Sequence, residues 1–121
     1  MALILLVEDS SFARKMTGNI LKKAGHEVVE AEDGLKGLEL LEARTPDCIV
    51  SDILMPLMDG HGFLEALREN GNRIPVIMLT ADVQEKTRQE CLELGALEIL
   101  HKPAQEASLL QAIGKALKEE V

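Results

Sequence analysis

The feature that most constrains this chain is a hydrophobic pattern whose period changes again and again along its length. Short, nearly continuous apolar runs alternate with longer segments in which apolar residues recur every three or four positions. Continuous apolar runs are typical of parallel β-strands covered on both faces, and the longer segments are typical of amphipathic helices. The pattern therefore predicts an α/β fold before any motif is considered.

Five strands are expected, at Leu3–Val7, Val28–Val29, Cys48–Ser51, Val76–Leu79 and Glu98–His101. Five helices are expected from apolar stripes, namely Phe12-Met16-Ile20-Ala24, Leu35-Leu38-Leu41, Phe63-Leu64-Leu67, Val83-Thr87-Cys91-Leu94 and Leu109-Ile113-Ala116-Leu117. Strand–helix–strand crossovers are almost always right-handed, so this order predicts one parallel sheet between two layers of helices.

Length and composition limit the functions that this chain can have. The 121 residues fit a single domain, 1–121, that is large enough to bury a core without disulfides or metals. The net charge of −8 argues against binding to nucleic-acid phosphates, and the absence of Trp and Tyr removes most stacking surface for bases or flavins. The two cysteines are too few for a disulfide framework, and no apolar run is long enough to span a membrane, so we expect a cytoplasmic protein.

Chemically capable side chains follow four of the five expected strands. They are Glu8 and Asp9 after the first strand, Asp52 after the third, Thr80 after the fourth and Lys102 after the fifth. The second strand instead runs into residues 30–33, which are typical of a solvated loop and a helix start. Since ligands bind at the carboxyl ends of the strands in open parallel sheets, we expect the four sets to converge on one site.

Each of these residues also has a purely structural interpretation. Acidic residues before a helix often compensate its dipole, an Asp that ends a strand is commonly a turn or cap residue, and a lone Thr or Lys there usually faces solvent. Together they favour a metal site, because two carboxylates about 5 Å apart repel by roughly 3 kcal/mol at an effective dielectric of about 20. Mg²⁺ removes that cost best, since it accepts a few carboxylates and keeps its remaining waters.

Four motifs give the chain a resemblance to the receiver domains of two-component response regulators, over essentially its whole length. The motifs are Leu6-Val7-Glu8-Asp9-Ser10, Ser51-Asp52-Ile53-Leu54-Met55-Pro56-Leu57-Met58-Asp59-Gly60, Leu79-Thr80-Ala81 and His101-Lys102-Pro103. The resemblance implies a flavodoxin-like (βα)5 fold, with a doubly wound parallel five-stranded sheet in the strand order 2-1-3-4-5.

The resemblance also implies a role for each matching residue. Asp52 would accept a phosphoryl group from a phosphohistidine, Thr80 would donate its hydroxyl to that group, and Lys102 would pair with it. The ligands of Mg²⁺, or of Mn²⁺ in its place, would be Glu8, Asp9, Asp52 and the backbone carbonyl of Leu54. The Lys102–Pro103 bond would be cis. Such a protein turns over no separate substrate and catalyses only its own phosphorylation and dephosphorylation.

The implied partners are a sensor histidine kinase or phosphotransfer protein and a downstream target bound by the fourth helix, fifth strand and fifth helix. Neither direct nucleic-acid binding nor membrane insertion is implied. Ile99 stands where the family usually has a Tyr or Phe that moves on activation, and Ala104 stands where Phe is common. Either these are harmless variations, or the target-binding face changes less sharply on phosphorylation.

The same residues disfavour other functions. A phosphohydrolase of the haloacid-dehalogenase type needs a second Asp two residues after its nucleophile, where this chain has Leu54. A flavodoxin-like cofactor site is disfavoured because Glu8 and Asp9 would repel its phosphate. A phosphorylation-independent interaction module would lack Asp52, Thr80 or Lys102. Residues 54 and 82 flank the expected phosphoryl site and would influence the lifetime of the phosphorylated state.

Overall fold

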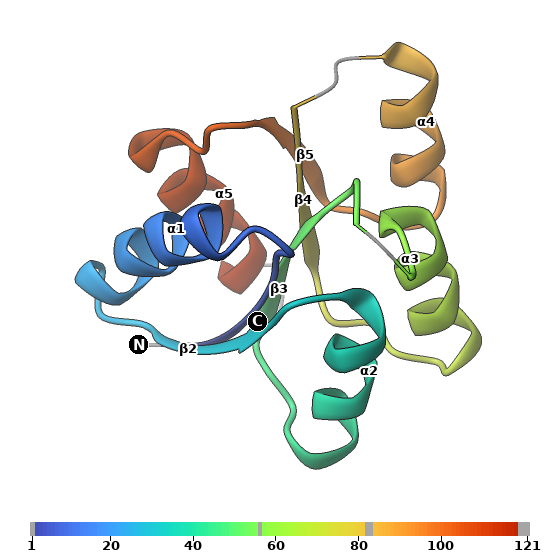
Figure 1. Ribbon diagram of the computed structural model, residues 1–121, viewed down its shortest axis with the longest axis horizontal. Coiled ribbons are helices and arrows are strands. Elements are labelled where there is room, and N and C mark those ends of the chain that lie inside the picture. The colour runs from blue at the N-terminus through green and yellow to red at the C-terminus, as the bar shows by residue number, and fades with distance from the viewer. Residues whose placement is uncertain (1, 56, 82–83, 119–121) are drawn as a thin grey trace.

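The computed structural model describes residues 2–55, 57–81 and 84–118, and its core is one five-stranded sheet with helices on both faces (Figure 1). The strands are β1 (Leu3–Val7), β2 (Glu27–Ala31), β3 (Cys48–Asp52), β4 (Val76–Thr80) and β5 (Glu98–His101). The helices are α1 (Ser11–Lys23), α2 (Gly34–Ala43), α3 (Gly60–Glu69), α4 (Glu85–Glu93) and α5 (Glu106–Lys118).

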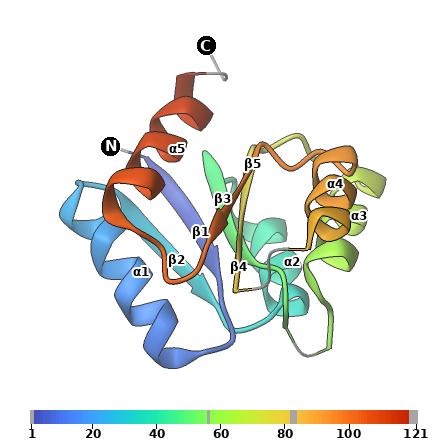
Figure 2. The same cartoon turned by 90° about the horizontal axis from the view of Figure 1, so that it is seen from above.

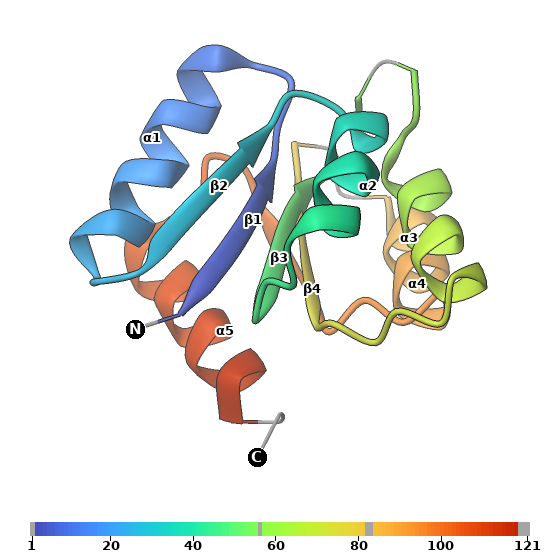
Figure 3. The ribbon, with the colours of Figure 1, turned by 90° about the horizontal axis from the view of Figure 1, so that it is seen from below.

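The strand order is β2-β1-β3-β4-β5, and every neighbouring pair is parallel. The predicted (βα)5 architecture and strand order are therefore confirmed. Helices α1 and α5 cover one face of the sheet, while α2, α3 and α4 cover the other (Figures 2 and 3). Because all strands run the same way, their carboxyl ends meet at a single edge.

Two hydrophobic cores lie on the two faces of the sheet. Successive side chains of a strand point to opposite faces, so Leu5 and Val7 of β1 join the core beneath α2, α3 and α4. Ile4 and Leu6 join the core beneath α1 and α5. The continuous apolar run of β1 is thus covered on both sides, as the sequence predicts. None of the described helices has the length and apolar character needed to cross a membrane.

The predicted apolar face of α1 is wrong in detail. Phe12 is 74% exposed and Met16 is 50% exposed, whereas the buried residues of α1 are Thr17, Gly18 and Leu21. The physical reason is that a helix has about 3.6 residues per turn, so residues four apart drift around its axis instead of staying on one face. A spacing of three, as in the predicted stripe of α2, also departs from the helical repeat, and Leu35 of α2 is exposed. Val83, expected on the fourth helix, lies outside the described residues.

Three strands extend beyond their predicted ends. β2 includes Glu30 and Ala31, which were expected in a loop, and β3 and β4 each continue for one residue to Asp52 and Thr80. The hydrogen bonds between strands join backbone groups, so polar side chains do not interrupt them. A strand end predicted at the last apolar residue is therefore placed too early. As a result, Asp52 and Thr80 are held by the sheet itself.

The two cysteines provide a test of the packing. Cys48 and Cys91 are reduced and completely buried, and burial, with the charges of Glu90 and Asp59, raises the pKa of the Cys91 thiol above its usual 9.0. Since the thiolate is the reactive form, we expect neither thiol to react with dithionitrobenzoate at neutral pH until the protein is unfolded in guanidinium. Reaction of either thiol in the native protein at the unfolded rate would contradict this packing.

Candidate functional site

The carboxyl edge of the sheet brings together the residues singled out in the sequence. Asp52 and Thr80 are the last residues of β3 and β4, while Glu8 and Lys102 directly follow β1 and β5. The backbone continues the sheet pattern past these ends, because the Glu8 N–H donates to the Ala31 carbonyl at 3.0 Å and the Lys102 N–H donates to the Thr80 carbonyl at 2.7 Å. All four residues therefore stand at the carboxyl edge of the sheet, as the sequence predicts.

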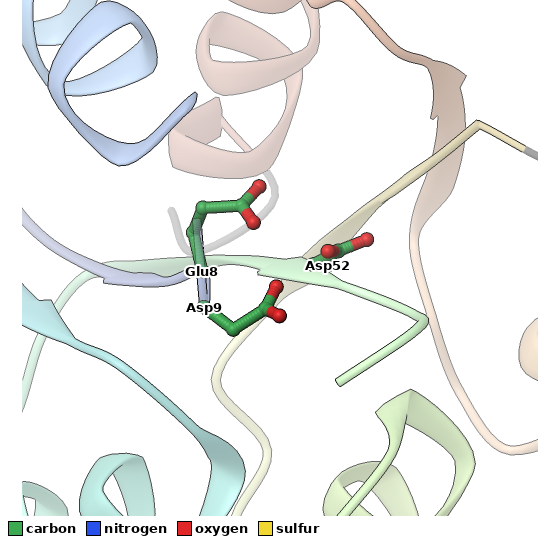
Figure 4. Close-up of side chains that lie close together, drawn as sticks. All are labelled: Glu8, Asp9 and Asp52. Atoms are coloured by element: carbon green, nitrogen blue, oxygen red, sulfur yellow. The ribbon is translucent and has the colours of Figure 1, made fainter. Parts of the chain in front are cut away.

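Three carboxylates form a cluster at this edge (Figure 4). Glu8, Asp9 and Asp52 each offer one oxygen, and the three oxygens lie within 4.8 Å of one another. Glu8 is 1% exposed and Asp52 is 5% exposed, whereas Asp9 is open to solvent. Two of the three charges are therefore screened little by water and must be balanced by groups within the protein.

Lys102 supplies part of that balance. Its Nζ lies 2.6 Å from Oε1 of Glu8 and donates a hydrogen bond to Oδ2 of Asp52 at 2.9 Å. The sequence predicts a role for Lys102 toward a phosphoryl group, but it does not predict the contact with Glu8. β1 and β5 are separated by two strands, so only a long side chain crossing the edge can make this contact. From the sequence, the contact between Lys102 and Glu8 could have been inferred only from the general rule that a buried carboxylate needs a partner.

Burial and pairing shift the ionisation of this pair. Burial raises the pKa of Glu8, and the neighbouring charge of Asp52 raises it further, while the ion pair with Lys102 and the hydrogen bond from the Ser10 N–H oppose the shift. Burial alone would lower the pKa of Lys102, but its pairing with the carboxylates of Glu8 and Asp52 outweighs that effect and raises it. The ammonium therefore stays charged, while the carboxylate cluster still favours one more cation.

The donor set of the cluster fits Mg²⁺. Oε1 of Glu8 is buried and makes no well-directed hydrogen bond among the described residues, even though Nζ of Lys102 lies close to it. Mg²⁺ prefers hard oxygen donors, and the three clustered carboxylates provide them. Leu54, whose carbonyl the resemblance adds as a ligand, lies two residues beyond Asp52 in the loop before α3, and its role stays a prediction.

The acidic residues at the strand ends could also have served only to cap the helices that follow. In the structure, neighbouring residues cap these helices. Oγ of Ser10 caps α1 by accepting from the Ala13 N–H at 3.2 Å, and a carboxylate oxygen of Asp59 caps α3 by accepting from the Gly62 N–H at 2.9 Å. Glu8 and Asp52 are thus left for the site.

The loop after β3 is closed tightly by Gly60. The Gly60 N–H donates to the Ile53 carbonyl at 2.7 Å, and a Cβ at position 60 would lie only 2.8 Å from the Ile53 Cα. Any larger residue would push the start of α3 away from the end of β3. Gly60 therefore helps to hold the backbone directly after Asp52.

The remaining predicted site residues lie beside this edge. Thr80 and Ile99 line a small cavity of about 60 Å³ between β4, β5 and α4, and Ile99 is half-buried against the core on that face. The Lys102–Pro103 peptide bond is cis, as the resemblance implies, and Ala104 packs against the core beneath α1 and α5. Asp82 lies outside the described residues.

Known proteins resemble this chain in both sequence and structure. The model of the response regulator receiver domain family matches residues 4–114. The chemotaxis protein CheY of Bacillus subtilis is 37% identical over 115 residues, which cover 94% of this chain and 96% of that protein. The structure of Vibrio cholerae CheY4 has a TM-score of 0.90 and 35% identity, covering 97% of this chain and 99% of that one. The Francisella response regulator 1452 receiver domain has a TM-score of 0.94 and 26% identity, with full coverage of both chains.

Proposed function

The chain belongs to the response regulator receiver domain family, and from that premise we propose that Asp52 is its phosphoacceptor. Receiver domains are signalling modules of two-component systems and do not turn over a separate substrate. The observation that carries the proposal is the position of Asp52, which is nearly buried within the carboxylate cluster and bonded to Lys102 at 2.9 Å. We further propose that residues 1–121 form a single receiver domain and that it works in the cytoplasm, where cysteines usually stay reduced.

In the proposed reaction, a carboxylate oxygen of Asp52 forms a bond to phosphorus while the bond between phosphorus and the donor histidine nitrogen breaks. The electron pair of that bond leaves with the imidazole, and the product is an acyl phosphate on Asp52. Lys102 transfers its pairing from the carboxylates to the phosphoryl oxygens, and Thr80 donates its hydroxyl to them. Phosphoryl transfer depends mainly on such positioning and charge neutralisation.

The cation expected at the cluster is Mg²⁺, with Mn²⁺ as a substitute. Glu8, Asp9 and Asp52 would hold it, together with the carbonyl of Leu54. When bound, it supplies positive charge that offsets the developing charge on the phosphoryl oxygens. Support for this assignment comes from the three oxygens within 4.8 Å of one another and from the buried Oε1 of Glu8, which lacks a well-directed hydrogen bond.

Receiver domains bind histidine kinases or phosphotransfer proteins and downstream targets. For this chain we propose that the target binds the face formed by α4, β5 and α5. Thr80 ends β4 directly before the segment that leads to α4, and Ile99 of β5 shares a cavity with it. A shift of Thr80 toward a phosphoryl group would therefore be passed first to this face.

The proposal is tested by incubating the protein with acetyl phosphate and Mg²⁺ and measuring its intact mass. We expect a gain of one phosphoryl group, reversed as the acyl phosphate hydrolyses and prevented by a metal chelator, because the carboxylates alone repel the anionic donor. No gain with any donor would contradict the proposal and would favour a phosphorylation-independent interaction module of the same fold.

A further inference from the structure

An open pocket lies at the amino edge of the sheet, opposite the carboxylate cluster. Its volume is about 440 Å³, and it is lined by Arg68, Gly71, Asn72, Arg73 and Gly95. Arg68 belongs to the last turn of α3, residues 71–73 lead from α3 into β4, and Gly95 leads from α4 into β5 (Figure 3). The volume falls within the range of about 300–1,000 Å³ that is typical of ligand sites. The proposed phosphorylation makes no use of this pocket.

The guanidinium of Arg68 is fixed in the wall of the pocket. Its Nε donates to the Leu94 carbonyl at 3.1 Å, its Nη2 to the Gly95 carbonyl at 2.8 Å and its Nη1 to the Asn72 carbonyl at 2.6 Å. Gly95 makes room for this arrangement, because a Cβ at position 95 would lie 2.6 Å from Nε of Arg68. A guanidinium has more N–H groups than these bonds use, so part of its donor capacity is left for a ligand.

The other side chains of the pocket also offer donors. Oδ1 of Asn72 already accepts from the Ile74 N–H at 2.9 Å, which leaves the amide N–H groups of Asn72 for a ligand. Arg73 is exposed, and its guanidinium forms no hydrogen bond or ion pair within the described part of the chain. The side chains around the pocket therefore present an excess of N–H donors over oxygen acceptors, which favours an anion.

The two arginines carry positive charge that no described carboxylate balances. Arg68 and Arg73 form no ion pair with any acidic residue in the described ranges, although the chain has 21 acidic residues. Arg44 at the end of α2, by contrast, pairs with Glu27 at 2.9 Å. Burial lowers the pKa of Arg68, and the nearby charge of Arg73 lowers it further. An anion bound to both guanidiniums would relieve their repulsion.

We propose that this pocket binds the phosphate group of a small phosphate compound, either inorganic phosphate or a phosphate monoester. Guanidinium groups bind phosphate oxygens through pairs of parallel hydrogen bonds, and the two positive charges match a phosphate dianion. Arg73 supplies a free fork, while Arg68 and Asn72 add donors that backbone contacts already hold in place. Bound phosphate would join the turn after α3 to the turn after α4, because Arg68 already contacts both. This inference does not depend on the role of Asp52.

The test titrates inorganic phosphate or glycerol phosphate into isotope-labelled protein and follows the backbone amide shifts by NMR. Mg²⁺ is removed with a chelator, and the ionic strength is held constant with sodium chloride. We expect saturable shifts at residues 71–73 and 95–96. Arg73→Gln is expected to weaken binding about tenfold or more, because a charged hydrogen-bonding partner is lost. Arg73→Lys keeps the charge without the fork and should recover only part of the affinity.

The two ligands distinguish the source of the phosphate group. Tighter binding of glycerol phosphate would support the site with a monoester as its ligand, whereas equal or weaker binding would support it with inorganic phosphate. Because Arg73 is exposed and makes no side-chain contact of this kind with the described residues, both of its variants should fold normally.

Arg44→Gln is the matched control, because it removes the same charge from an exposed arginine at the same edge of the sheet, beside β2. Its affinity for phosphate should equal that of the native protein. Shifts that fail to saturate would overturn the proposal. An equal loss of affinity in Arg44→Gln and Arg73→Gln would also overturn it, since only the general charge of the surface would then matter. So would shifts confined to residues around Asp52 and Lys102, which would place the phosphate at the carboxyl edge.

Discussion

Replacing Asp52 by asparagine is expected to abolish phosphorylation by acetyl phosphate, with a fall in rate on the order of a thousandfold or more. The amide is neutral and its oxygen is a poor nucleophile, so the attacking group is lost while the size of the side chain barely changes. Intact mass after incubation with acetyl phosphate and Mg²⁺ measures the loss. Circular dichroism checks that the variant is folded.

Asp33→Asn provides a matched control for this substitution. Asp33 caps α2 by accepting a hydrogen bond from the Lys36 N–H at 2.8 Å, and asparagine caps helices about as well as aspartate. The control variant should therefore be labelled at the native rate. A phosphoryl gain that persists in Asp52→Asn would remove Asp52 as the nucleophile and point to another carboxylate of the cluster.

Truncation of Phe63 to alanine is expected to lower the free energy of unfolding by about 3–5 kcal/mol. Phe63 of α3 is completely buried, and it packs so close to α2 that a Cβ on Gly37 would lie 3.2 Å from its Cε1. Neighbouring helices held this tightly cannot collapse to fill the space, so the variant carries a cavity as well as lost apolar burial. Urea unfolding followed by circular dichroism measures the loss, because the chain has no Trp or Tyr for fluorescence.

The second phenylalanine of the chain supplies the control. Phe12 is 74% exposed, so Phe12→Ala should change the free energy of unfolding by no more than about 0.5 kcal/mol. If Phe63→Ala leaves too little native protein to measure, Phe63→Leu should show a smaller loss in the same direction. Equal losses at both phenylalanines would contradict the packing described here.

Much of the fold could be predicted from the sequence because it depends on local patterns. The alternation of apolar runs and helical stripes predicts five parallel strands, and the residues that follow the strands predict which side chains meet. Element ends were less accurate, as Glu30 and Ala31 of β2 illustrate, because backbone hydrogen bonding continues past the last apolar residue. The exposed side of α1 was also wrong, since a spacing of four only approximates the helical repeat.

The sequence predicted which residues form the candidate site but not which of them form ion pairs. Glu8, Asp52 and Lys102 were all expected at the edge, yet the 2.6 Å contact between Lys102 and Glu8 spans strands that are not neighbours. Ile99 stands where the family usually has a Tyr or Phe. In the structure it is a half-buried strand residue that packs against the core, which is compatible with both interpretations of this difference. Whether its lack of an aromatic ring weakens the change on phosphorylation stays a prediction.

By itself, the sequence determined the class of fold, the order of its elements and the carboxylates, hydroxyl and ammonium at the carboxyl edge of the sheet. These follow from periodicity and chain order, which are properties of neighbouring residues. Only the tertiary structure decided that Glu8 is buried with a raised pKa, that Lys102 lies between Glu8 and Asp52, and that a pocket lined by two arginines opens at the opposite edge of the sheet. Desolvation, ion pairing and open space depend on how side chains from distant segments pack together, and no local pattern carries that information.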